Sequence, residues 1–350
     1  MNRTAFTRLA VVIGVLAVAV VARAGQTPSP ALVVVSSLEV PGTSLELPGG
    51  VVMIVDPAVG KVVGQVPVGT TPYGVTVSPD GRLAFVGNPN RGEGRPEADS
   101  ISVIDLAARK EVRRVDVGKG VRLHALQVAG DRVYFTASGN KSVGWYDPTS
   151  NRVEYFTLGQ GGPHMLAVSK DHNTVYASNP TSNNVSVIAN VRGGAVITHI
   201  PVGRTPEGID IAPDGREVWT ANEEGGGVSI ITIGSRAVQT IDLQTKHANR
   251  LRFTPDGRLV LLLDREAGEL IVVDARARKV IKRVSLVGPG EIMDVGDFVV
   301  VPDGSRVYVT VGKEEGDRHY IGEVDLKTLA ITRRIETVIR PNAVAWVQRN

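Results

Sequence analysis

Two histidines and a glutamate occupy equivalent positions of a long-period repeat, and their side-chain types suit proton transfer. His124, His164 and Glu207 follow one another at intervals of 40 and 43 residues. If the fold brings these positions together, an imidazole can act as general acid or base near neutral pH. The carboxylate can then orient that imidazole or share its proton. We therefore take these three residues as the catalytic candidates.

The same three side chains allow two other interpretations. Two imidazoles and a carboxylate can bind a divalent metal ion such as zinc. They can equally be the polar lining of a hydrated channel, because a channel mouth needs polar groups wherever water reaches. The sequence leaves these alternatives open, and no cofactor is predicted.

Further polar residues near the same repeat position are candidates for binding a ligand. The guanidinium groups of Arg122 and Arg250 can hold a carboxylate or phosphate through paired hydrogen bonds. His247 lies two residues before one of the repeat positions and could reach the same point. The ligand-binding candidates are Tyr73, Arg122, Asn249, Arg250 and Asn342.

Short strands in a repeat must position these residues. Pro-Asp-Gly occurs at 79–81, 213–215, 255–257 and 302–304, and each copy lies between apolar-alternating segments, as expected for a hairpin turn. Three further β-branched segments follow each turn-preceding strand, which predicts four-stranded antiparallel sheets. Aligning the start of the turn-preceding strand gives seven equivalent positions, separated by 40 to 51 residues: Tyr73, His124, His164, Glu207, Asn249, Gly296 and Asn342.

The two ends of the repeat region complement each other. Residues 343–347 form one strand after the last repeat position, whereas 32–35, 51–56 and 61–69 form three strands before the first. One strand plus three makes a whole blade, and this closure removes a free sheet edge. The predicted fold is all-β: a seven-bladed β-propeller of four-stranded antiparallel blades, whose ring is closed by N-terminal strands plus the C-terminal strand.

Such a ring would collect the seven equivalent positions around one mouth of a central channel. The loops after the second strand of each blade would share that face. They cover residues 36–50, 87–100, 138–142, 179–184, 222–227, 264–269 and 312–320.

The chain resembles the YVTN-repeat β-propeller family. The signature appears as 307–310 (Val-Tyr-Val-Thr), 218–222 (Val-Trp-Thr-Ala-Asn) and 175–179 (Val-Tyr-Ala-Ser-Asn), and the Pro-x-Gly starts at 72–74 and 206–208 match too. The resemblance implies the propeller fold. The family looks to include lactonase-like enzymes, haem-binding domains of nitrite reductases and surface-layer proteins, so it does not select one activity.

Residues 1–24 are typical of a secretory signal peptide. A basic start precedes the apolar run 9–21, and Ala22-Arg23-Ala24 supplies a small-x-small cleavage site. We expect cleavage near Ala24 and a periplasmic or secreted location; a retained anchor is the alternative. Residues 25–350 are expected to form a single monomeric propeller domain without a membrane span in the mature chain.

Composition excludes several classes of function. The chain has no cysteine, which rules out disulfides, thiolate metal sites, cysteine nucleophiles and c-type haem attachment. The leader holds three arginines and no acidic residue, so the mature chain is close to neutral and nucleic acid is not an expected partner.

The sequence therefore favours a module that binds a small molecule or a protein at the channel mouth. The alternative is a lactonase-like hydrolase or lyase with His/Glu acid–base chemistry in the channel. Gly-x-Ser-x-Gly, a P-loop and His-Glu-x-x-His are all absent from the sequence.

Overall fold

The computed structural model of the protein describes residues 31–36, 50–89, 98–288, 294–312, 319–337 and 340–348. The predicted signal peptide lies outside the described residues. So do most of the mouth-face loops 36–50, 87–100 and 312–320. No helix among the described residues is long and apolar enough to cross a membrane.

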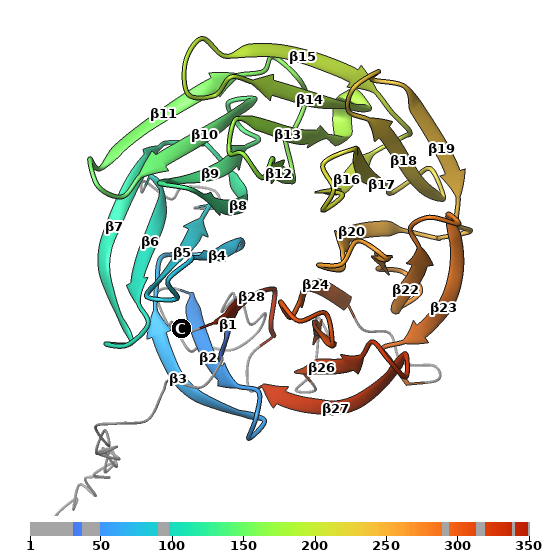
Figure 1. Cartoon of the computed structure of the whole chain (residues 1–350). Coiled ribbons are helices and arrows are strands. Elements are labelled where there is room, and N and C mark those ends of the chain that lie inside the picture. The colour runs from blue at the N-terminus through green and yellow to red at the C-terminus, as the bar shows by residue number, and fades with distance from the viewer. Residues whose placement is uncertain are drawn as a thin grey trace, which may run out of the picture.

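The described strands form seven four-stranded antiparallel sheets, which Figure 1 shows arranged in a ring around a common axis. An all-β propeller with four-stranded antiparallel blades is thus confirmed. We number the blades from 1 at β4 to 7 at β28 with β1–β3.

In each blade, the first strand named is the innermost. Blade 1 contains β4 (Val75–Val77), β5 (Leu83–Asn88), β6 (Asp99–Asp105) and β7 (Lys110–Gly118). Blade 2 contains β8 (Leu123–Ala129), β9 (Arg132–Ala137), β10 (Ser142–Asp147) and β11 (Arg152–Thr157). Blade 3 contains β12 (Leu166–Val168), β13 (Thr174–Asn179), the 3-10 turn η1 (Pro180–Ser182), β14 (Asn184–Ala189) and β15 (Val196–Pro201). Blade 4 contains β16 (Pro206–Ile211), β17 (Glu217–Asn222), β18 (Gly227–Thr232) and β19 (Val238–Asp242).

The remaining three blades follow the same order. Blade 5 contains β20 (Ala248–Phe253), β21 (Leu259–Asp264), β22 (Glu269–Asp274) and β23 (Lys279–Ser285). Blade 6 contains β24 (Asp294–Val300), β25 (Arg306–Gly312), β26 (His319–Asp325) and β27 (Ala330–Thr337). Blade 7 contains β28 (Ala343–Val347), β1 (Ala31–Ser36), β2 (Val51–Asp56) and β3 (Lys61–Pro67).

Blade 7 combines strands from the two ends of the described chain. β28 pairs with β1 over five residue pairs, from Ala31 opposite Val347 to Val35 opposite Ala343. Figure 1 shows β28 beside β1 and β2. The outermost strand β3 ends two residues before the end of the predicted strand 61–69.

The four Pro-Asp-Gly segments are the predicted turns. Gly81, Gly215, Gly257 and Gly304 have φ of 67°, 71°, 69° and 71°, a left-handed conformation that glycine adopts without steric cost. Each turn joins the innermost strand of a blade to its second strand, and so fixes which residue of the innermost strand enters the channel.

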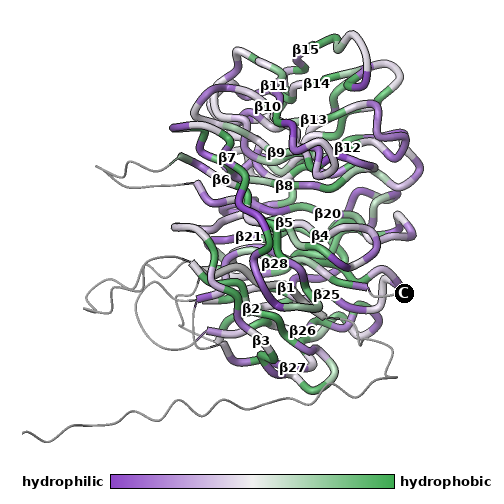
Figure 2. Tube along the Cα trace, turned by 90° about the vertical axis from the view of Figure 1, so that its left-hand side faces the viewer, coloured by the Kyte–Doolittle hydropathy of each residue, from purple (hydrophilic) through white to green (hydrophobic). Residues whose placement is uncertain are grey.

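The hydrophobic core lies between neighbouring sheets. In one cluster, Trp219 and Ile230 of blade 4 pack with Phe253, Leu262 and further residues of blade 5. Figure 2, an edge-on view, shows hydrophobic residues along the strands and mainly hydrophilic residues at the turns on the two faces. Each blade buries its apolar faces against two neighbouring blades. Packing around the whole ring therefore fixes the positions of the residues at the channel mouth.

Asparagines that end the second strand tie it to the third. Asn179 Nδ2 donates to Ser186 Oγ at 2.8 Å, and Asn222 Nδ2 donates to Ser229 Oγ at 3.0 Å. Both asparagines are buried. The loops that leave these strands toward the mouth therefore start from fixed points.

Candidate functional site

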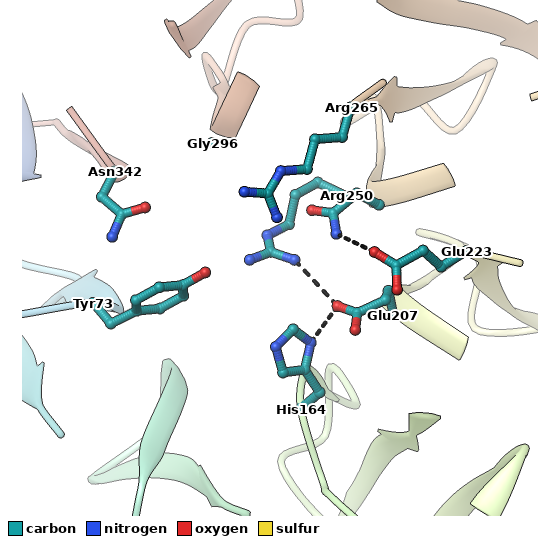
Figure 3. Close-up of a pocket in the computed structure, with 9 residues that line it drawn as sticks. Tyr73, His164, Glu207, Glu223, Arg250, Arg265, Gly296 and Asn342 are labelled. Atoms are coloured by element: carbon teal, nitrogen blue, oxygen red, sulfur yellow. Dashed lines mark hydrogen bonds and ion pairs between the residues drawn. The ribbon is translucent and has the colours of Figure 1, made fainter. Parts of the chain in front are cut away.

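The innermost strands bring the predicted repeat positions together around the channel mouth. They enclose a cavity of about 130 Å³. Figure 3 shows side chains from several blades pointing into it. The cavity is lined by Tyr73, His164, Glu207, Glu223, Asn249, Arg250, Arg265, Gly296 and Asn342.

Irregularities in strand pairing turn these side chains inward. The register between the first two strands shifts between Leu123 and Leu126 in blade 2 and between Ala248 and Leu251 in blade 5. The same shift occurs in blades 4 and 6. Bulges of this type redirect side chains and are common beside active sites. In blade 5 the shift places both Asn249 and Arg250 on the cavity.

Hydroxyl groups on the second strands hold the backbone at these positions. The backbone N–H of Ala125 donates to Thr136 Oγ1 at 2.9 Å, and Thr136 Oγ1 donates to the carbonyl of His164 at 2.8 Å. Ser178 Oγ donates to the carbonyl of Glu207 at 2.6 Å. One blade therefore positions the catalytic candidate of the next, which preorganises the site.

The three catalytic candidates form one continuous chain of contacts. His124 and His164 face each other with their Nε2 atoms 2.7 Å apart, so one ring donates and the other accepts. His164 Nδ1 contacts Glu207 Oε2 (Figure 3). Tyr73 packs on His124 with ring centroids 4.1 Å apart. Because a carboxylate bound to one imidazole nitrogen fixes the ring and its tautomer, Glu207 can orient His164 as a proton carrier.

Arg250 links this chain to the opposite side of the channel. Its side chain is only 6% exposed, and Nη1 lies 3.5 Å from Glu207 Oε2. Nε lies 3.9 Å from Asp297 Oδ1. Burial disfavours the charged guanidinium, but Tyr73, Asp297 and Glu207 outweigh burial and raise the pKa of Arg250. The group remains a buried cation.

Two cavity residues come from loops and were not singled out from the sequence. Glu223 follows β17 and Arg265 follows β21, each directly after the residue that ends the second strand. Glu223 Oε1 lies 2.6 Å from His247 Nε2, and Asn249 Nδ2 donates to the same oxygen at 3.3 Å. Both loops were predicted to lie on the mouth face. The first residue after each second strand could therefore have been predicted to lie near the channel mouth. His247 contacts this site through Glu223.

Arg122 is placed differently from the other ligand-binding candidates. Its side chain is exposed, its φ is 55°, and it is not among the residues that line the cavity. Its backbone N–H donates to Asp99 Oδ2, and its carbonyl accepts from the N–H of Ser138. Arg122 thus shapes the rim with its backbone.

A smaller cavity of about 40 Å³ lies deeper in the channel. Tyr73, His124, Arg250, Arg252 and Asp297 are among its lining residues. The described residues contain no group of three or more His, Asp or Glu side chains placed to hold a metal ion.

The two glutamates of the main cavity have pKa values shifted in opposite directions. Burial acts to raise the pKa of Glu207, but the hydrogen bond and charge of His164, followed by the charges of Arg250 and His247, lower it overall. For Glu223, burial and the nearby charge of Glu207 raise the pKa above 4.5. Opposed shifts within one pocket are typical of functional sites.

We predict that Glu223→Gln raises the melting temperature at pH 7. A carboxyl group whose folded-state pKa is raised adds stability below its unfolded pKa, and this stability is lost as pH rises through the folded pKa. At pH 7, where the unfolded chain ionises this group freely, Glu223 therefore costs folding stability that glutamine avoids, whereas below about pH 4 the acid is protonated in both states and the gain should vanish. Thermal unfolding of both proteins from pH 4 to 8 measures this. A lower melting temperature for the variant at pH 7 would contradict it.

The sequence matches no protein-family model and no curated protein sequence. Solved structures are similar over most of the chain. A periplasmic gluconolactonase from Pseudomonas aeruginosa matches with a TM-score of 0.70 and 20% identity, over 92% of this chain and 99% of that one. Hydrazine synthase from Kuenenia stuttgartiensis matches with a TM-score of 0.62 and 20% identity, over 83% and 90%. Virginiamycin B lyase from Staphylococcus aureus matches with a TM-score of 0.64 and 14% identity, over 79% and 92%.

These likenesses establish the architecture. The chain is a β-propeller related in fold to lactonase and hydrazine synthase propellers. At such identities the shared property is the fold, which hosts unrelated functions.

Proposed function

We propose that the channel mouth binds a small polar molecule that carries a carboxylate or a similar anionic group. The observation that carries this proposal is the buried guanidinium of Arg250. Its Nη1 and Nε atoms are shielded from solvent and lie 3.5 and 3.9 Å from carboxylate oxygens of Glu207 and Asp297, which is too far for strong hydrogen bonds. The protein therefore satisfies this guanidinium only loosely, and a ligand oxygen in the cavity that Arg250 lines could add a charge-assisted hydrogen bond to it.

The shape and lining of the cavity support a small occupant. A cavity of about 130 Å³ is small beside the pockets of about 300–1,000 Å³ that bind drug-sized ligands. Figure 3 shows the guanidinium groups of Arg265 and Arg250 reaching into the same space. Two neighbouring guanidinium groups suit a carboxylate, whose oxygens can accept several charge-assisted hydrogen bonds. A small ligand fits this space better than a protein loop.

A second candidate is catalysis on that ligand by acid–base chemistry. It is favoured by the contact chain Glu207–His164–His124, in which a carboxylate orients a histidine that faces a second histidine. A lactonase-like hydrolase or a lyase could use this chain. We further propose that the protein acts in the periplasm or after secretion, on the basis of the leader-like residues 1–24.

Arg265→Gln is expected to weaken ligand binding by roughly 10- to 100-fold, because a charge-assisted hydrogen bond contributes about 1.5–3 kcal/mol. The measurement is calorimetric titration of the propeller with glycolate, L-lactate, L-malate and succinate. Arg258→Gln is the matched control, since that side chain is 81% exposed and follows the turn at the other end of blade 5. The proposal fails if none of the four acids binds, or if both variants bind as the parent does.

The same preparation tests the enzymatic candidate. D-glucono-1,5-lactone is added, and its hydrolysis is followed by acid release. If the parent protein accelerates hydrolysis above the uncatalysed rate and His164→Ala does not, the enzymatic candidate is favoured. If the parent protein binds the acids but does not accelerate hydrolysis of the lactone, it acts as a binding module and is not a hydrolase for this class of lactone.

A further inference from the structure

The main cavity carries charges of both signs on different sides. Arg265 and Arg250 enter it from blade 5, while Glu207 and Glu223 enter it from blade 4 (Figure 3). These side chains come from separate strands and loops, so the fold places both signs of charge on one cavity, where Arg250 and Glu207 approach each other to 3.5 Å. A cavity lined only for an anion would not need the two carboxylates.

The protein pairs the two carboxylates to different extents. Glu207 contacts both His164 and Arg250. Glu223 contacts His247 and Asn249, and the charge of Arg265 also favours its ionised form. The charge of Glu207 acts on Glu223 from within the same cavity and disfavours its ionised form. A positive group placed between the two carboxylates would relieve this repulsion.

A ligand bearing only negative charge would meet these carboxylates as well as the arginines. The cavity is small, so an anion bound beside Arg265 would also lie near Glu223. Repulsion from that carboxylate would offset the attraction to Arg265. A ligand with its own cationic group could satisfy both sides at once.

We propose, building on the proposed function, that the ligand is a small zwitterion, an amino acid whose carboxylate lies against Arg265 and Arg250 and whose ammonium group lies against Glu223 and Glu207. Each end then gains charge-assisted hydrogen bonds. Discrimination arises from Glu223, since an otherwise identical ligand with a hydroxyl in place of the ammonium group offers that carboxylate only a neutral hydrogen-bond donor.

Three matched pairs of probes test this inference. L-Alanine is compared with L-lactate, β-alanine with 3-hydroxypropionate, and 4-aminobutyrate with 4-hydroxybutyrate. Each pair exchanges one ammonium for one hydroxyl, and the three pairs sample different distances between the charged ends. Calorimetric titration at pH 7 should show at least tenfold tighter binding of the amino member in one pair or more.

The variants then locate the source of the preference. In Glu223→Gln the ratio of the two dissociation constants should fall toward one, whereas Glu224→Gln, the same change at an adjacent exposed residue, should keep it. The inference is overturned if the hydroxy acids bind at least as tightly as the amino acids in every pair, or if Glu223→Gln leaves the ratio unchanged; the proposed anion site survives either result. If neither member of any pair binds, the zwitterion inference falls, whereas the anion site is decided by glycolate, L-malate and succinate.

Discussion

Replacing Arg250 by methionine should lower the free energy of unfolding by about 3–5 kcal/mol, the usual cost of removing one partner of a buried ion pair. Methionine keeps the length of the side chain but removes the charge. Glu207 and Asp297 are both buried, and each lies within 4 Å of the Arg250 guanidinium. Removing that cation leaves buried carboxylates short of a countercharge, which is why a large effect is expected.

The loss should depend on pH in a defined direction. The pKa of Glu207 is lowered by His164 and by Arg250, so its favourable interactions are fully present above its unfolded pKa of about 4.5 and fade as pH falls through the folded value. The difference between the parent protein and Arg250→Met should therefore shrink in acid. Urea unfolding at pH 7 and at pH 4 measures both free energies.

Two further variants make the Arg250 experiment specific. Arg258→Met changes an exposed arginine of the same blade and should alter stability by less than about 0.5 kcal/mol. The double variant Arg250→Met with Glu207→Gln should recover part of the loss, since one unpaired carboxylate is neutralised. If Arg250→Met unfolds like Arg258→Met, the guanidinium does not hold the two carboxylates.

Most of the site geometry follows from the repeat in the sequence. Seven residues at one repeat position were predicted to meet at one mouth. The structure brings His124, His164 and Glu207 into direct contact there. This inference works because a propeller places equivalent positions of successive blades around one axis, so sequence separation does not matter.

The contacts of the residues next to the repeat position were harder to predict from the sequence. Arg250 and Asp297 each stand one residue after it, in adjacent blades, and they approach to 3.9 Å. Their pairing depends on the register shift in β20 and β24, which lets two successive residues reach the channel. A strict alternation of strand residues would have pointed only one of them inward.

Loop residues form the part that the repeat does not encode. Glu223 and Arg265 occupy the equivalent position after the second strand of adjacent blades, but the sequence does not show that these loop residues turn into the cavity. Arg122 shows the reverse case: it neighbours the repeat position, yet its left-handed backbone conformation accompanies an exposed side chain. Local backbone geometry therefore determines whether the side chains of Glu223, Arg265 and Arg122 reach the cavity.

Val347→Asp should lower the free energy of unfolding by about 3–6 kcal/mol, because it removes a buried valine and buries an unpaired polar group. Val347 is 1% exposed and belongs to a cluster with Val52 of blade 7 and Ala84 and Val86 of blade 1. Its backbone lies opposite Ala31 in β1. The substitution therefore acts at the junction where strands from the two ends of the described chain complete one sheet.

Val238→Asp is the matched control, since that valine is 39% exposed on the outermost strand β19 and should tolerate the change. Urea unfolding gives both free energies, and light scattering reports whether Val347→Asp also associates, as expected if β1 becomes an unpaired edge. If the two variants lose equal stability, β28 does not close the ring. Because the channel mouth takes Asn342 and Tyr73 from either side of that junction, an open ring would also remove one wall of the proposed binding cavity.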